Sequence, residues 1–294
     1  MYIQSIKNDT QNLPKPLASN KRPLGGESVS SSSCYSKPVL QQAFQDLEVH
    51  APDCIESAEI FNSDSAYFDN KVVFAIRDWN SSPASQILHI EGPSETKNTS
   101  ITSKVACSVA KVLSDLNLPT VYLFCGWASK SGEKWMISTI YRLIKRLAEH
   151  LDVVEGEYLD FDYMRIQELD GTLKTWDEAL SIFSSLLDYA PPSLYVIIDG
   201  IERLENMDGN EKYVSSLLRL LLDRVTREVL CNGIGKQLKV LLTTTGSISS
   251  LNQLDDKELR TVTLNRQSTK GRPGDSRLGR SQIVLKVETY AKEM

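Results

Sequence analysis

The chain changes its pattern of apolar and polar positions at about residue 86. From there to about residue 264, short apolar runs alternate with longer stretches in which apolar residues recur every three or four positions. Short runs rich in β-branched and aromatic residues are typical of buried strands, and the longer stretches are typical of helices with one buried face. The runs, in chain order, lie at 87–90, 121–125, 194–198 and 240–242.

Strands that alternate with helices predict βαβ units with right-handed crossovers. We therefore expect an α/β fold with a parallel sheet of about five strands and helices on both of its faces. The helical stripes are interpreted as core packing against that sheet. They are Ile137, Ile140, Tyr141, Ile144, Leu147, Ala148 and Leu151, then Trp176, Ala179, Leu180, Phe183 and Leu187, and finally Val214, Leu217, Leu218, Leu221 and Val225.

The rest of the chain differs in composition from this region. Residues 1–36 are rich in Ser, Pro, Asn and Lys, which predicts a disordered tail. Residues 37–84 are expected to form a helical lead-in, with a helix at 69–79, and 85–265 the α/β domain. Residues 266–294 hold a basic segment and a run at 283–287 that predicts a last strand. The basic segment is interpreted as a solvated linker, with contact to a phosphate or an acidic partner as the alternative.

Bulk composition narrows the classes of function. The 294 residues are 41% hydrophobic and 24% charged with a net charge of -5, which fits one globular domain and gives no basic footprint for nucleic acid. The five cysteines show no CxxC spacing and the three histidines lie far apart, so we expect reduced thiols and no zinc site. No apolar run has the length of a signal peptide or a membrane span, which predicts a cytoplasmic protein.

A glycine-led loop follows the first apolar run and leads into a helical stretch. A strand, a loop and a helix in this order are the setting of a phosphate-binding loop. Against the pattern GxxxxGK[ST], Gly92 and Thr99 match, but Lys97 replaces the second glycine and Asn98 replaces the lysine. A side chain at the second glycine resists a positive φ angle, and the missing lysine removes the ammonium group that spans the β- and γ-phosphates.

An acid ends the third apolar run. Asp199 is a candidate magnesium ligand, and Glu202 is a candidate for positioning an attacking water. The alternative is that these acids, and Glu205 after them, cap the next helix. The run at 240–242 continues into three threonines, which suit a position beside a γ-phosphate or simply finish a β-branched strand.

Taken in order, these segments resemble the NACHT-type P-loop region of fungal STAND proteins over roughly residues 65 to 265. The resemblance implies a P-loop NTPase-like fold in which Gly92 and Thr99 end the Walker A loop, and Asp199 is the Walker B aspartate with Glu202 three residues later. The chain departs from that family at four positions that serve the triphosphate. These are Lys97, Asn98, Arg203, where the family has an acid, and Thr245, where it has a sensor arginine.

The resemblance therefore implies a degenerate module that regulates or binds a protein partner without hydrolysing ATP. We expect no cofactor, with Mg-ATP as the alternative ligand held through Asp199 and Thr99, and no nucleic acid or membrane partner. The rival hypothesis is an active ATPase or GTPase that uses Lys97 in place of the missing lysine. A different α/β enzyme is a third alternative, but the chain has no GxSxG elbow.

Overall fold

The structure is a computed structural model. It describes residues 42–44, 47, 68–94, 100–125, 132–151, 164–207, 209–230, 236–252, 259–264 and 280–281. The predicted tail at 1–36 and the predicted strand at 283–287 lie outside these residues, and so does the basic segment apart from Arg280.

Five parallel strands form the central sheet, in the order β3-β4-β5-β2-β6. They are β2 (Gln86–Gly92), β3 (Thr120–Phe124), β4 (Ser193–Asp199), β5 (Gln237–Thr245) and β6 (Leu259–Thr263). The predicted α/β class is confirmed, and the four apolar runs are β2 to β5. The apolar pattern did not indicate β6, because this edge strand is mostly exposed and reads Leu-Arg-Thr-Val-Thr.

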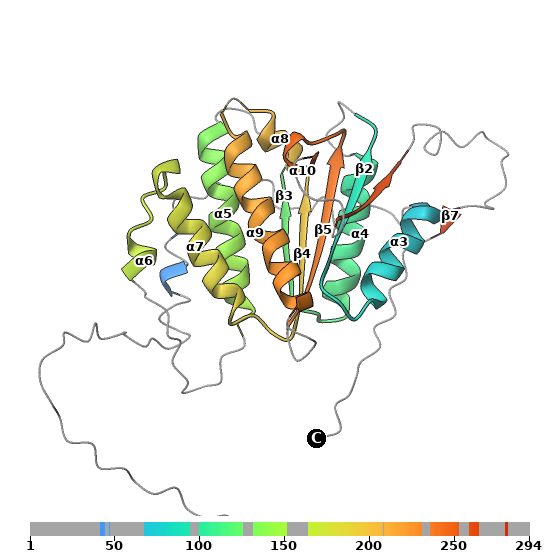
Figure 1. The fold of residues 1–294 in the computed structure, drawn as a ribbon, viewed down its shortest axis with the longest axis horizontal. Coiled ribbons are helices and arrows are strands. Elements are labelled where there is room, and N and C mark those ends of the chain that lie inside the picture. Colours follow the sequence, from blue (N-terminus) through green and yellow to red (C-terminus); the bar gives the residue numbers. More distant parts are fainter. Residues whose placement is uncertain are drawn as a thin grey trace, which may run out of the picture. The chain divides into compact units, whose positions relative to one another are not determined.

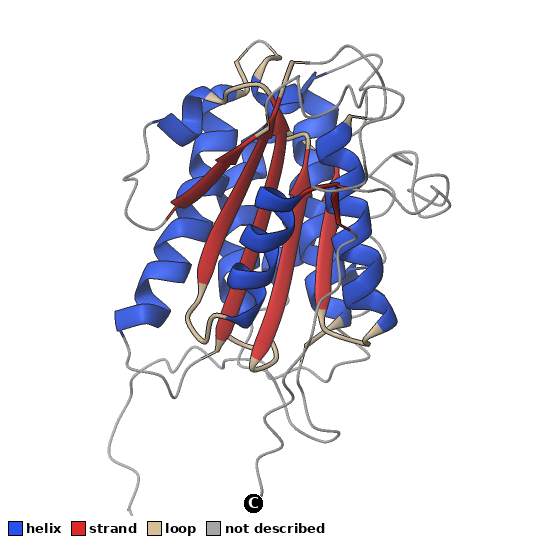
Figure 2. Ribbon diagram, turned by 90° about the vertical axis from the view of Figure 1, so that its right-hand side faces the viewer, coloured by secondary structure: helices blue, strands red, loops and turns tan. Residues whose placement is uncertain are grey.

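Helices cover both faces of the sheet (Figures 1 and 2). One face packs on α3 (Asn70–Ser81) and α4 (Ile101–Asp115). The other packs on α5 (Gly132–Glu149), α7 (Trp176–Leu187) and α9 (Glu211–Leu230). All residues of the three predicted stripes are buried here, so their interpretation as core packing is confirmed.

The described part of the chain also contains shorter elements. They are β1 (Phe68–Asp69), which pairs antiparallel with β7 (Arg280–Ser281), then α6 (Met164–Gln167), the 3-10 turn Leu173–Thr175, α8 (Glu202–Glu205) and α10 (Ser249–Asn252). The expected helix at 69–79 is α3, which begins after the Asp69 cap and ends before Ser82. No described helix is long and apolar enough to cross a membrane.

The strand order creates a switch point at the carboxyl ends of β2 and β5. These strands are neighbours, with Gly92 in register with Thr245. The chain leaves β2 through α4 on one face, whereas it leaves β5 through α10, which packs against α9 on the other face. Neighbouring strands whose connections go to opposite faces leave a crevice at their carboxyl ends, and ligands of α/β proteins bind there.

A buried lysine ties the opposite end of the sheet together. Lys239 on β5 is fully buried, and its ammonium group donates hydrogen bonds to the backbone carbonyls of Trp79, Ser82 and Ala84 at 2.7, 2.8 and 2.7 Å. These carbonyls belong to the end of α3 and the loop before β2, where a helix leaves carbonyl groups without partners. The lysine therefore joins α3 to the centre of the sheet.

Candidate functional site

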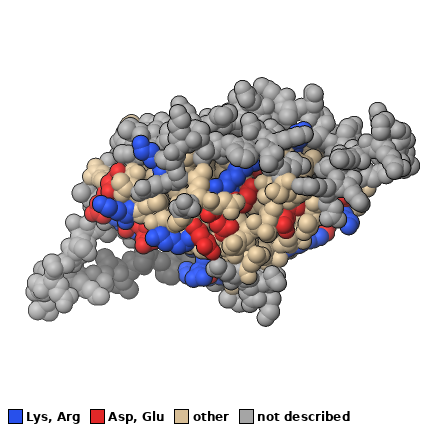
Figure 3. All heavy atoms as spheres, turned by 90° about the horizontal axis from the view of Figure 1, so that it is seen from above, with Lys and Arg blue, Asp and Glu red and all other residues tan. Residues whose placement is uncertain are grey.

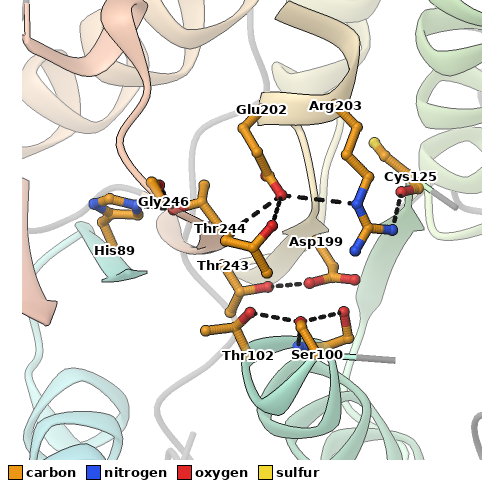
Figure 4. Close-up of polar contacts among 12 residues, drawn as sticks. His89, Ser100, Thr102, Cys125, Asp199, Glu202, Arg203, Thr243, Thr244 and Gly246 are labelled. Carbon is orange, nitrogen blue, oxygen red and sulfur yellow. Dashed lines mark hydrogen bonds and ion pairs between the residues drawn. The ribbon is translucent and has the colours of Figure 1, made fainter. Parts of the chain in front are cut away.

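The candidate residues meet at the carboxyl edge of the sheet. Gly92 ends β2, Asp199 ends β4 and Glu202 begins α8. Lys97, Asn98 and Thr99 lie outside the described residues, so the predicted phosphate-loop contacts stay predictions. Figure 4 shows the polar contacts that connect the described members of the site.

Gly92 is a point of close approach between β2 and α4. A Cβ atom at this position would lie 2.6 Å from the Cγ2 atom of Thr102 and 3.5 Å from the carbonyl oxygen of Thr244. The first of these distances is shorter than any normal contact, so only glycine fits while Thr102 keeps its methyl group. The glycine that opens the predicted phosphate loop thus has a packing role that is independent of any ligand.

Gly92→Ala is therefore expected to cost about 1 to 3 kcal/mol of stability, measured by urea unfolding. The matched control is Thr102→Ser, which removes the clashing methyl group and keeps the hydroxyl. In the double variant the cost of Gly92→Ala should shrink to a few tenths of a kcal/mol, because the next atoms lie at 3.5 and 3.6 Å. Equal costs in the two backgrounds would contradict this packing.

Hydroxyl groups fill the amino end of α4. Ser100 is the N-cap residue, and its Oγ accepts a hydrogen bond from the backbone N–H of Ser103 at 2.9 Å. The same oxygen lies 2.8 Å from Thr102 Oγ1 and 2.9 Å from Ser103 Oγ. Sequence reasoning did not single out Ser100 or Ser103, although a serine directly before an apolar helical stretch is an N-cap signal.

Asp199 lies next to this hydroxyl cluster and is almost completely buried, with 3% of its surface exposed. Its Oδ1 accepts a hydrogen bond from Thr243 Oγ1 at 2.6 Å, and the hydroxyl of Ser103 also bonds to the carboxylate. Burial raises the pKa of Asp199 to about 6, and the two hydroxyls and the Arg203 charge partly oppose that rise. The carboxylate is therefore ionised at pH 7 in spite of its burial.

Glu202 binds the end of β5. Its Oε1 accepts hydrogen bonds from Thr245 N at 3.1 Å and from Thr245 Oγ1 at 2.6 Å. Its other oxygen, Oε2, is buried and has no hydrogen-bond partner among the described residues. A buried acceptor of this kind costs free energy and calls for an explanation, such as a donor that arrives with a ligand or a water molecule.

The alternative that these acids cap the next helix is wrong for Asp199 and Glu202, and Glu205 caps α10 instead of α9, the helix that follows it in the chain. No side chain caps α8, because Asp199 and Glu202 bond to Thr243 and Thr245 on β5. The carboxylate of Glu205 accepts hydrogen bonds from the backbone N–H groups that begin α10. The threonines at the end of β5 are accordingly more than strand formers, since two of them hold the acids of β4 and α8.

Arg203 adds a positive charge to the two acids. Its Nε lies 3.8 Å from Glu202 Oε1, and its Nη1 donates a hydrogen bond to the carbonyl of Cys125 at 2.9 Å. Gly200, with a φ of +76°, makes room for it, because a Cβ there would lie 3.4 Å from the guanidinium carbon and 2.9 Å from the Cys125 carbonyl. The ends of β3, β4 and β5 are thus joined through one chain of polar contacts.

A magnesium ion does not fit the described residues as they stand. Magnesium needs carboxylate or water oxygens in octahedral positions and is repelled by a neighbouring cation. Here a guanidinium group lies beside Glu202, with Arg203 Nε 3.8 Å from Glu202 Oε1, and its charge also acts on Asp199. Within the described ranges, no group of three or more His, Cys, Asp or Glu side chains is arranged to hold a metal.

Comparisons with known proteins give distant structural likenesses. No family model matches the chain, and no curated protein matches it. The Aeropyrum pernix ORC1 protein in complex with DNA is matched at a TM-score of 0.37 and 12% identity, over 76% of this chain and 48% of that one. A structure of Drosophila ORC bound to GC-rich DNA and Cdc6 is matched at 0.32 and 12%, over 89% and 37%.

A structure of C. elegans PCH-2 is matched at a TM-score of 0.26 and 15% identity, over 80% of this chain and 44% of that one. The chain therefore spans less than half the length of each of these three structures. The DNA is a component of the ORC structures and says nothing about what this chain binds.

Proposed function

We propose that this chain is a P-loop-type domain that acts by binding a protein partner and does not hydrolyse nucleoside triphosphates. The observation that carries the proposal is the network of hydrogen bonds and one ion pair among side chains at the carboxyl edge of the sheet. Asp199, Glu202 and Arg203 are held by Thr243, Thr245 and the Cys125 carbonyl. Groups that bond to each other in this way stiffen the ends of three strands, whereas a hydrolytic site must present them to a ligand.

The sequence departures point in the same direction. Lys97 and Asn98 replace the glycine and lysine of the phosphate loop, and Arg203 replaces an acid. The resemblance to fungal NACHT-type STAND proteins supports a descent from nucleotide-dependent switches, in which the P-loop region controls assembly with other proteins. We infer that this domain has kept the scaffold of such a switch and works by protein contact.

A nucleic-acid partner is not part of the proposal. The chain has a net charge of -5, and phosphate backbones are bound mainly by clustered Lys and Arg side chains. Figure 3 looks onto the end of the sheet that is at the top of Figure 1, and acidic and basic side chains are mixed on the described part of that face. This mixture favours an ordinary protein surface over a basic stripe.

The rival function is an ATPase or GTPase that uses Lys97. One observation favours it, namely the buried Oε2 of Glu202, which has no partner among the described residues and could orient a water molecule. This function requires that purified protein releases phosphate from ATP or GTP faster than the Lys97→Ala variant does. Equal background rates in both proteins would rule out the ATPase or GTPase function.

The proposal is tested by thermal unfolding with ATP, ADP, GTP and GDP, each with and without magnesium. We expect no nucleotide to raise the melting temperature. A nucleotide that did bind, at a hundredfold excess over its Kd, would add about 2.7 kcal/mol of stability, which is a rise of several degrees. The Asp199→Ala variant is the matched control for binding at the site. Isothermal titration that showed magnesium-dependent, micromolar ATP binding, lost in Asp199→Ala, would refute the proposal.

A further inference from the structure

Two buried acids at the carboxyl edge need a positive counter-charge. Asp199 and Glu202 are both 3% exposed, and their charges oppose each other, because Glu202 raises the pKa of Asp199. A buried carboxylate without a counter-charge costs several kcal/mol, and a second one nearby adds to that cost. In P-loop-type sites a divalent cation normally supplies the counter-charge.

Arg203 supplies a positive charge at this place from the protein itself. Its side chain is 14% exposed, its Nε lies 3.8 Å from Glu202, and its charge lowers the pKa of Asp199. A guanidinium group stays protonated under all conditions in which proteins are folded, so this charge is permanent. Its position agrees with Figure 4, where Arg203 lies between the two acids and Cys125.

Backbone atoms fix the position of the guanidinium group. Gly200 leaves β4 with a φ of +76°, and the space of its missing Cβ is bounded by the Cys125 carbonyl and by the Nε and Cζ atoms of Arg203. The Cys125 carbonyl then accepts the Nη1 hydrogen bond at 2.9 Å. The end of β3 and the turn after β4 both contact the Arg203 side chain, so the position of its guanidinium group does not depend on a ligand.

We propose that Arg203 is the permanent counter-ion of Asp199 and Glu202 and replaces a divalent cation at this edge of the sheet. Removing the guanidinium charge then leaves two buried carboxylates that a magnesium or manganese ion can neutralise. This inference rests on the proposed function and extends it, because it explains why the site needs no metal ion.

The test compares thermal unfolding of the wild type and Arg203→Gln in millimolar MgCl2, MnCl2 or EDTA, without nucleotide. Glutamine keeps an N–H donor for the Cys125 carbonyl and removes the charge. We expect no metal-dependent shift in the wild type and a rise of about 3 °C or more in Arg203→Gln. The rise should vanish in Arg203→Gln with Asp199→Asn. The matched control is Arg219→Gln on the exposed face of α9, which should behave as the wild type.

The outcomes separate the two proposals. An equal metal-dependent shift in wild type and Arg203→Gln would overturn the counter-ion inference, and so would a folded Arg203→Gln protein that shows no shift. If Arg203→Gln is unfolded in EDTA, it should regain its far-UV circular dichroism in MgCl2, and failure to do so would also overturn the inference. Because no nucleotide is present, none of these results decides the proposed function.

Discussion

Lys239→Met is expected to lower the free energy of unfolding by about 3 kcal/mol, the largest loss of stability among the proposed variants. The variant keeps the length of the side chain and removes the Lys239 donor from the carbonyls of Trp79, Ser82 and Ala84. The Ser82 carbonyl keeps a second donor, Gln237 Nε2 at 2.8 Å, so the loss falls on the carbonyls of Trp79 and Ala84. Each buried carbonyl that loses its partner costs about 1 to 3 kcal/mol. Burial of the ammonium group opposes this loss, since burial lowers the pKa of Lys239 to about 8, but two carbonyls without a donor outweigh one desolvated cation that remains charged at neutral pH.

The control for this prediction is Lys71→Met, on the exposed side of α3, which should change stability by less than about 0.5 kcal/mol. Urea unfolding followed by far-UV circular dichroism measures both variants. A Lys239→Met protein as stable as the wild type would show that these carbonyls find other partners. It would also show that Lys239 does not stabilise the packing of α3 against β5.

Asp199→Asn is expected to stabilise the protein by up to about 3 kcal/mol at pH 7 to 8. Burial raises the pKa of Asp199 from 3.8 to about 6. Between these two values the folded protein binds a proton that the unfolded chain does not, so wild-type stability falls as the pH rises from 3.8 to about 6. Asparagine has the shape of the neutral acid and does not ionise, so the Asp199→Asn protein does not lose this stability as the pH rises.

The gain should therefore be small at pH 4 and reach its full size above pH 6, which unfolding at a series of pH values measures. Asp223→Asn, at an exposed position on α9, is the control and should show no such pH dependence. A destabilised Asp199→Asn protein at pH 8 would mean that the ionised carboxylate is needed by its hydroxyl donors.

The sheet and its helices were predictable because their signals are local. The runs that became β2 to β5 are continuous apolar segments, and the stripes of α5, α7 and α9 repeat with the period of a helix. All of these residues are buried except Tyr122, which is half-buried. The edge strand β6 was missed, because an exposed strand has no apolar run. Asp199 was placed correctly at the end of its strand, since an acid after an apolar run is visible without knowing its neighbours.

The interactions of the candidate site could not be predicted in the same way. Glu202 and Thr245 are far apart along the chain, and so are Arg203 and Cys125, yet each pair is in contact. The pairing of β4 with β5 brings the first two together, and the pairing of β3 with β4 brings the second two together. Strand order is set by how the whole sheet buries its apolar surface, and no single segment contains that information.

The sequence by itself determined the α/β class, the main helices and strands, and the departures of the phosphate loop at Lys97 and Asn98, because each of these depends on residues close together in the chain. The tertiary structure alone decided that Gly92 serves packing against Thr102 and that Lys239 binds the end of α3. It also decided that Arg203 bonds to the Cys125 carbonyl and that Glu202 bonds to Thr245, because contacts between distant segments form only when the strands take their order in the sheet.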